Sequence, residues 1–222
     1  MCGEAIKNFG LCIACRLELP WVINGCQHCA NPLPSISPLC GKCLQKPPPY
    51  DLILALFYYR PPIDHLLGSL KFANQLAYAQ FLGQLLAEKV HAHYATHPKP
   101  ELIIPMPLHV KRLQQRGFNQ AVELSRPLAK MLAIPLSLHH CVRVIATQPQ
   151  SSIPASARQQ NMVEAFTVVS AITAKHVAIV DDVVTTGSTV IELVKTLRKS
   201  GVTRVDVWCC ARTVLGELRN SC

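Results

Sequence analysis

The chain has 222 residues, half of them apolar, and carries a formal net charge of +9. This length accommodates one ordinary domain, or one domain with a small appendage, and the apolar content excludes a wholly disordered chain. No apolar run reaches the roughly 18 residues that a membrane-spanning helix needs. The N-terminus also lacks the charged-then-apolar pattern of a secretory signal, so we expect a cytoplasmic globular protein without a membrane span.

The N-terminal segment is dense in cysteine. Seven of the eleven cysteines lie within residues 1–43, and six form three CxxC pairs: Cys12 with Cys15, Cys26 with Cys29, and Cys40 with Cys43. Zn²⁺ takes four thiolates in a tetrahedron, and a CxxC turn supplies two of them. In a reducing compartment such pairs indicate structural zinc rather than disulfides, and the helix-start context of a redox CxxC is absent.

The assignment of the three pairs to metal sites stays open at this point. The second and third pairs are close enough in sequence to close one site, whereas the first pair has only Cys2 upstream of it. Ligation of the first pair with the third is an alternative. We predict a zinc-binding module over residues 1–46, followed by an extended joint, "KPPPYD", because proline fixes its own φ and restricts the residue before it.

Strands and helices alternate in the predicted second domain, residues 47–222. Strands are expected at "LILALFYY" (52–59), "ELIIPMPL" (101–108), "HVAIVDD" (176–182) and "RVDVWCCAR" (204–212). Helical spacing of apolar residues predicts two helices within 62–94, one over 119–133 and one over 188–201. We expect Asn119 to cap the third of these, Pro127 to kink or divide it, and Gly201 to end the fourth. This order predicts an α/β fold, with a parallel sheet covered by helices on both faces and ligands at the carboxyl ends of its strands.

The end of the third predicted strand and the segment after it carry the chemistry that suggests a ligand. Two acids are followed by a turn of small and hydroxylated residues: Asp181, Asp182, Val183, Val184, Thr185, Thr186, Gly187, Ser188 and Thr189. Backbone N–H groups and hydroxyls around the glycine can form a nest at a helix N-terminus, which suits a phosphate monoester. The acids can accept hydrogen bonds from a sugar diol or hold Mg²⁺. A 5-phosphorylated ribose has this layout.

A basic segment follows the second strand. Residues 105–160 contain seven Lys or Arg residues and a single acidic residue. This excess of positive charge suggests a polyanionic partner, although a generally basic surface is an alternative. Lys111, Arg112 and Arg116 are candidates to bind a diphosphate opposite the ribose. We expect a loop there, and a flap over 147–161 that carries Gln148, Arg158 and Asn161. Neither GxxxxGK[ST] nor GxGxxG occurs, which excludes Walker and Rossmann fingerprints.

"VAIVDDVVTTGST" (177–189) resembles the signature of the type I phosphoribosyltransferases. "PMPL...R...RGFNQ", the CxxC pairs, "CLQKPPPYD" and "RQQNMVEAF" narrow the resemblance to the ComF/GntX family. It covers nearly the whole chain, but the family usually opens with a full CxxCG where this chain has only "MCG". The resemblance implies a phosphoribosyltransferase fold fused to a zinc module, with a link to natural competence and DNA uptake. It also implies that Asp181 and Asp182 meet the ribose hydroxyls of 5-phosphoribosyl 1-diphosphate, while residues 185–189 wrap its 5-phosphate.

Three functions are therefore expected as alternatives. The first is Mg²⁺-assisted transfer of a phosphoribosyl group to an unidentified acceptor, which needs charge stabilisation more than a side-chain nucleophile. The second is a competence factor that binds single-stranded DNA and works with the DNA-uptake machinery. The third is a regulator that senses phosphoribosyl diphosphate without turnover. An aromatic content of 6% argues against a base-stacking platform.

Overall fold

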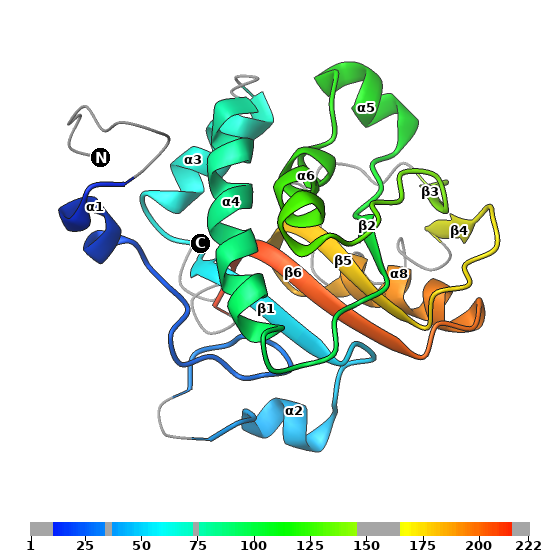
Figure 1. Cartoon of the computed structure of the whole chain (residues 1–222), viewed down its shortest axis with the longest axis horizontal. Helices are drawn as coiled ribbons and strands as arrows, with labels where there is room; N and C mark the ends of the chain where they lie inside the picture. The colour runs from blue at the N-terminus through cyan, green and yellow to red at the C-terminus, as the bar shows by residue number, and fades with distance from the viewer. Residues whose placement is uncertain (1–10, 34–36, 73–75, 146–164, 215–222) are drawn as a thin grey trace.

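The computed structural model describes residues 11–33, 37–72, 76–145 and 165–214. Three residues of the expected flap, Gln148, Arg158 and Asn161, lie outside the described residues, as does Cys2. The described chain consists of a four-stranded parallel sheet, helices on both of its faces and a cysteine-rich segment along one edge (Figure 1).

The sheet has the strand order β1-β6-β5-β2, and all its neighbouring strands are parallel, as the alternation of elements predicted. Its apolar runs follow from burial on both faces, which is typical of parallel sheets. The predicted strand at 204–212 has the observed bounds of β6. The strands are β1 (Leu52–Tyr58), β2 (Leu102–Pro105), β5 (His176–Val184) and β6 (Arg204–Arg212).

Two apolar cores lie on opposite faces of the sheet. On one face, Val180 and Trp208 pack with side chains of α3 (Ile63–Phe72), α4 (Leu76–His93) and α6 (Gln120–Leu132). On the other face, Ile179 and Val207 pack with α8 (Ser188–Lys199), which lies behind the sheet in Figure 1. Neighbouring residues of a strand point to opposite faces, so each central strand contributes to both cores.

Helix α6 begins as predicted but is not divided at Pro127. The Asn119 side chain accepts a hydrogen bond from the backbone N–H of Ala121 at 2.9 Å, which caps the helix. The helix continues through Pro127, and α4 packs closely against it there. A Cβ placed on Gly83 of α4 would lie 2.8 Å from the Leu124 carbonyl oxygen and 3.0 Å from Pro127 Cγ.

The basic segment that we expected to be a loop is a short helix, α5 (Val110–Arg116). The His109 side chain accepts from the Lys111 backbone N–H, and Gly117 ends the helix with a φ of 77°. Pro105 and Pro107 end the strand but do not prevent a helix from starting three residues later, where these two caps bound it. An antiparallel pair, β3 (Cys141–Arg143) and β4 (Phe166–Val168), lies beside it.

The cysteine-rich segment covers the outer edge of β1. It contains two short helices, α1 (Ile13–Glu18) and α2 (Gly41–Gln45), which lie apart from each other in Figure 1. Between them, the Val22 N–H donates to the Leu56 carbonyl at 3.0 Å, and the Gln27 carbonyl accepts from the Ile53 N–H at 3.2 Å. Such pairing satisfies a strand edge that would otherwise be exposed. A division at residue 46 remains a prediction.

Within the described ranges, no helix combines the length and the apolarity that crossing a membrane requires.

Candidate functional site

A cavity of about 270 Å³ lies at the carboxyl ends of β2 and β5. It forms because β2 stops early: Pro105 pairs with Val180, and the Met106 N–H donates to the Val180 carbonyl at 2.8 Å. Pro107 has no N–H with which to extend the ladder. Strand β5 continues to Val184 alongside β6 alone, so its last four residues border the space that β2 has left.

Both acids of the predicted site line this cavity. Asp181 and Asp182 lie within β5, as the predicted strand 176–182 implied, and the strand continues for two residues beyond them; both acids are half-buried. The Asp181 carboxylate accepts from the Asp182 N–H at 2.9 Å, and the Asp182 carboxylate accepts from the Val183 N–H at 2.7 Å. Each carboxylate is thus oriented by the backbone beside it. Their hard oxygen atoms suit Mg²⁺ or a pair of hydroxyl donors.

The turn after β5 brings backbone and hydroxyl groups to the same cavity. Gly187 has a φ of 81° and precedes the first residue of α8, so the N-terminus of this helix opens at the cavity. Thr186 is exposed and does not line the cavity; its hydroxyl lies 2.8 Å from that of Ser188. The predicted residues of this turn that line the cavity are Val183, Val184, Thr185, Gly187, Ser188 and Thr189.

Three arginines, two of them predicted, form the basic wall of the cavity. Arg112 and Arg116 come from α5, and Arg143 comes from β3. Burial lowers the pKa of Arg112, and the charge of Arg116 lowers it further. Burial also lowers the pKa of Arg143, as does Arg112, whereas Asp181 raises it. Mutual repulsion of partly desolvated guanidinium groups favours an anion between them. Lys111 is exposed and does not line the cavity, so its part in binding remains a prediction.

Several lining residues were not identified from the sequence. Arg143 belongs to the basic segment, and a parallel bridge between His109 and Arg143 brings β3 beside the start of α5, a contact between residues distant in sequence. Gln120 accepts from Arg116 Nη1 at 3.2 Å, and its buried Nε2 has no partner among the described residues. That amide is therefore a donor that a bound anion could satisfy. Tyr59 and Asn119 also line the cavity.

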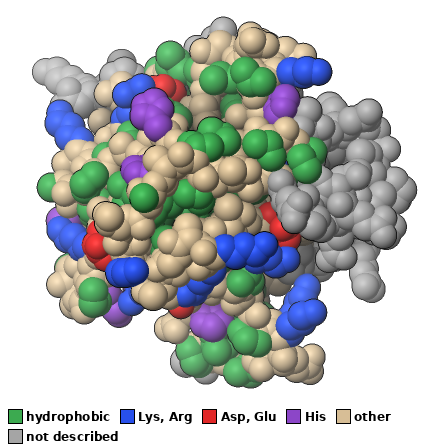
Figure 2. Space-filling view, turned by 90° about the vertical axis from the view of Figure 1, so that its right-hand side faces the viewer, with side chains coloured by type: hydrophobic (Ala, Val, Ile, Leu, Met, Phe, Trp, Pro, Cys, Tyr) green, Lys and Arg blue, Asp and Glu red, His purple; other side chains and the backbone are tan. Residues whose placement is uncertain are grey.

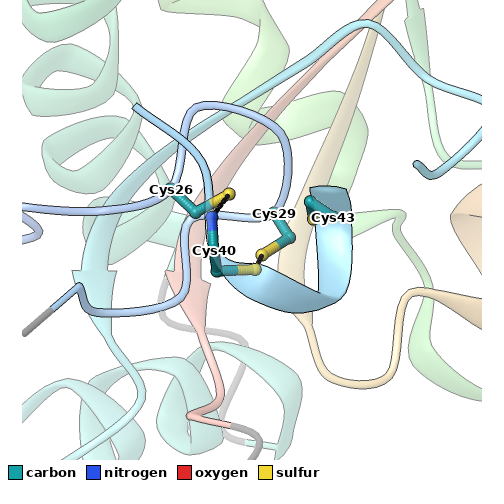
Figure 3. A group of neighbouring side chains, drawn as sticks. All are labelled: Cys26, Cys29, Cys40 and Cys43. Atoms are coloured by element: carbon teal, nitrogen blue, oxygen red, sulfur yellow. Dashed lines mark hydrogen bonds between the residues drawn. The ribbon is translucent and has the colours of Figure 1, made fainter. Parts of the chain in front are cut away.

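The second and third CxxC pairs come together in one cluster (Figure 3). The Sγ atoms of Cys26, Cys29, Cys40 and Cys43 all lie within 4.8 Å of one another, and those of Cys29 and Cys40 are 3.6 Å apart. Zn–S bonds of about 2.3 Å in a tetrahedron require sulfur separations of about 3.8 Å. The four thiols therefore fit one zinc ion.

Backbone N–H groups favour the thiolate form of one of these cysteines, Cys26, which is the form that binds a metal cation. Burial raises the pKa of Cys26, but hydrogen bonds from the backbone of Cys40, Cys29 and His28 lower it to about 7. The Cys40 N–H donates to Cys26 Sγ at 3.3 Å. Burial raises the pKa of Cys29 to about 11, so only a bound metal would hold all four sulfurs as thiolates near neutral pH.

The first CxxC pair is not part of this cluster. Cys12 immediately precedes α1 and Cys15 lies within it. The Cys12 Sγ accepts a hydrogen bond from the Cys15 N–H at 3.4 Å. The described residues thus pair the second and third CxxC motifs, not the first with the third. A metal-binding role for the first pair remains a prediction.

The sequence of this chain is similar to a family model and to several named proteins. A family model described as "Phosphoribosyl transferase domain" matches residues 116–217. The chain is 37% identical over 212 residues to the DNA utilization protein YhgH of Salmonella typhi, covering 95% of this chain and 93% of that protein. It is also 37% identical over 212 residues to competence protein F of Haemophilus influenzae, covering 93% and 92% of the two chains.

Among solved structures, a purine phosphoribosyltransferase from Pyrococcus horikoshii Ot3 aligns over 72% of this chain and 77% of its own, at 20% identity and a TM-score of 0.33. That likeness is too weak to add to the sequence relationship. The parallel sheet, the four-cysteine cluster and the full-length sequence relatives agree with one another, and the chain belongs to the ComF/GntX family of phosphoribosyltransferase-fold proteins.

Proposed function

We propose that the cavity binds 5-phosphoribosyl 1-diphosphate together with Mg²⁺. The observation that carries this proposal is the shared lining: two carboxylates, a helix N-terminal turn and three arginines meet in one space of about 270 Å³. The carboxylates suit a diol, the helix N-terminal turn suits a phosphate monoester, and the arginines suit a diphosphate. 5-Phosphoribosyl 1-diphosphate carries these three groups at three places around one sugar. The matching family model supports the same ligand class.

Each group of residues has a distinct part in this proposal. The turn from Thr185 to Thr189 would hold the 5-phosphate through backbone N–H groups and hydroxyls. Arg112, Arg116 and Arg143 would hold the diphosphate, for which guanidinium groups offer paired donors. Asp181 and Asp182 would accept from the ribose hydroxyls or hold Mg²⁺, which neutralises negative charge on the diphosphate when bound.

The same arrangement supports phosphoribosyl transfer as the reaction. Departure of diphosphate from the anomeric carbon develops positive charge on the ribose, and the carboxylates beside it would stabilise that charge. The arginines would stabilise the negative charge of the leaving group. Such catalysis depends on prearranged charge, so it requires no side-chain nucleophile. The acceptor, expected to be a nitrogen nucleophile, is not identified.

Calorimetry with phosphoribosyl diphosphate and Mg²⁺ tests the binding site. We expect Asp181→Asn combined with Asp182→Asn to weaken binding about 100-fold, because two hydrogen bonds to charged groups are lost. Arg112→Ala should weaken it about tenfold. Arg126→Ala is the matched control, since Arg126 is exposed, pairs with Glu123 and does not line the cavity. The zinc content of all variants should be unchanged. Unaltered affinity in the double aspartate variant would exclude the cavity as the site.

Release of diphosphate separates catalysis from sensing. Purified protein, Mg²⁺ and phosphoribosyl diphosphate are incubated with a mixture of cell metabolites, and diphosphate is measured over time. An enzyme releases diphosphate only when an acceptor is present, and the aspartate variants lose this activity. Binding without any acceptor-dependent release would favour the regulator that senses phosphoribosyl diphosphate.

Binding of single-stranded DNA is a second candidate function. The similar proteins are named for DNA utilization and competence, and Lys and Arg side chains gather near the centre of the face shown in Figure 2. Contacts with DNA phosphates release counterions, so affinity should fall steeply as salt rises. Retention of single-stranded DNA that is independent of salt would exclude a phosphate-driven interaction.

A further inference from the structure

Arg212, the last residue of β6, lies between the cysteine cluster and the cavity. Only 2% of its surface is exposed. Its Nε donates to the Cys29 carbonyl at 2.8 Å, and its Nη1 donates to the Val184 carbonyl at 2.8 Å and to the Thr185 carbonyl. A further bond reaches the Thr213 carbonyl at 3.1 Å. A buried charge needs such compensation, and here backbone carbonyls supply it.

These bonds orient two peptide groups of the phosphate turn. In a trans peptide the N–H points opposite to the C=O. Because the Val184 and Thr185 carbonyls accept from Arg212, the N–H groups of the same peptides, which belong to Thr185 and Thr186, point away from the guanidinium. Arg212 also places a positive charge beneath a turn that borders the cavity, which favours a dianionic phosphate there.

The Nε of the same guanidinium is hydrogen-bonded to the backbone carbonyl of Cys29, whose side chain is a predicted zinc ligand. The Cys29 carbonyl belongs to the CxxC turn whose sulfurs lie with those of the third pair. Closure of this turn around a metal holds its backbone in one conformation. A metal bound by these sulfurs would therefore fix the Cys29 carbonyl and, through the hydrogen bond to it, Arg212.

Tyr50 lies close to the phosphate turn and within electrostatic range of Arg212 and Cys29. It is buried, and its hydroxyl would lie 3.9 Å from a Cβ placed on Gly187. Burial raises the pKa of Tyr50, Arg212 lowers it, and Cys29 raises it. The buried tyrosine is thus influenced by the guanidinium and by the cysteine cluster together.

We propose that Arg212 couples the zinc cluster to the phosphate turn, so that zinc and a sugar 5-phosphate each strengthen the binding of the other. This inference rests on the proposed ligand site and adds regulation to it: loss of zinc would weaken substrate binding. Arg212 acts as a positioning residue, because it donates to carbonyls of the turn but does not line the cavity.

Equilibrium linkage in the unaltered protein is the first test. The zinc affinity is measured by competition with a chromophoric chelator, with and without saturating ribose 5-phosphate. We expect ribose 5-phosphate to tighten zinc binding at least about fivefold, and zinc to tighten ribose 5-phosphate binding by the same factor, because coupling is reciprocal. Ribose without phosphate should have no effect.

Variants test whether Arg212 is the link. Lysine keeps the charge, but it cannot donate to several carbonyls in a fixed fork, so Arg212→Lys should abolish the coupling and weaken ribose 5-phosphate binding about tenfold. Arg198→Lys is the matched control: Arg198 also donates to backbone carbonyls, those of Pro49 and Thr203, but it contacts neither site. Its coupling should equal that of the unaltered protein.

Hydrogen exchange provides a readout that needs no variant. With ribose 5-phosphate bound, zinc removal should accelerate exchange of the Thr185 and Thr186 amides but not that of the α5 amides. If the protein binds no ribose 5-phosphate, both this inference and the proposed function are wrong. If it binds ribose 5-phosphate with a zinc affinity that does not change, only the coupling is wrong. Unchanged exchange at residues 185–186, or coupling that persists in Arg212→Lys, would also overturn it.

Discussion

At the scale of single residues, Asp206 illustrates how a buried charge is held. It is fully buried in β6 and accepts from the Tyr94 hydroxyl at 2.6 Å and from His176 Nε2 at 2.7 Å. Arg204 lies 3.3 Å from the same carboxylate. Burial raises the pKa of Asp206, but the hydrogen bonds from His176 and Tyr94 outweigh it and leave the pKa below the ordinary value of 3.8.

Asp206→Asn should lower the free energy of unfolding by about 3 kcal/mol at pH 7, because the partners of a buried carboxylate lose its charge. A lowered folded-state pKa stabilises the protein above the unfolded-state value and loses that contribution as the pH falls through the folded-state value. The difference between the two proteins should therefore shrink below about pH 4 in urea titrations. Glu192→Gln, which breaks a partly exposed ion pair, should cost less than about 1 kcal/mol. A difference that is constant with pH would contradict the assignment.

Gly187 is the residue whose backbone the phosphate turn requires. Its φ of 81° is costly for a residue with a side chain, although a Cβ would meet no atom closer than 3.9 Å. We expect Gly187→Ala to cost about 1–2 kcal/mol of stability from backbone strain alone, and Gly187→Asn to cost less. Calorimetry should show weaker ribose 5-phosphate binding for alanine than for asparagine. Equal affinity for the two variants would mean that this conformation is not needed for the ligand.

At the scale of elements, the contact between α4 and α6 decides how closely two long helices pack. Gly83 permits this approach, because a Cβ there would lie 2.8 Å from the Leu124 carbonyl oxygen. Gly68 in α3 is the matched case, since a Cβ there would have no heavy atom within 4 Å. Both glycines lie within helices, where alanine is intrinsically favoured by about 1 kcal/mol.

Alanine at these two positions should therefore have opposite effects. Gly68→Ala should raise the free energy of unfolding by about 0.5–1 kcal/mol, because only helix propensity changes. Gly83→Ala should lower it by about 1–3 kcal/mol, because the helices must move apart to admit the methyl group. Chemical denaturation of the two variants measures both changes. Stabilisation by Gly83→Ala would show that the helices can separate without cost.

At the scale of the whole molecule, the cysteine-rich segment is tied to the sheet rather than suspended from it. Trp21 packs on Phe57 with ring centroids 4.6 Å apart, and Arg212 joins the Cys29 carbonyl to the phosphate turn. Zinc binding should therefore stabilise the sheet as well as the cluster. The stability of a protein that binds a ligand only when folded rises with ligand concentration.

We expect the melting temperature to increase with buffered free zinc, corresponding to about 4 kcal/mol at a concentration one thousand times the dissociation constant. Cys43→Ser should abolish this dependence, because it removes one of the four clustered thiols. Cys12→Ser should preserve it, since Cys12 lies outside the cluster. Scanning calorimetry with a zinc buffer makes the measurement. A melting temperature independent of zinc in the unaltered protein would contradict a structural metal.

Contiguous patterns alone determined the parallel α/β fold, the bounds of β6, the Asn119 cap, the two acids near the end of β5 and the turn that follows it, because strand period, helix caps and turn chemistry are local properties. The tertiary structure decided which distant groups meet. Arg143 and Gln120 joined the cavity, Lys111 was left outside its lining, and the second and third CxxC pairs came together without the first. The contact of Arg212 with both sites likewise depends on β6 lying beside β5 and near the cysteine cluster. Such neighbours are set by strand order and helix packing, which no short stretch of sequence encodes.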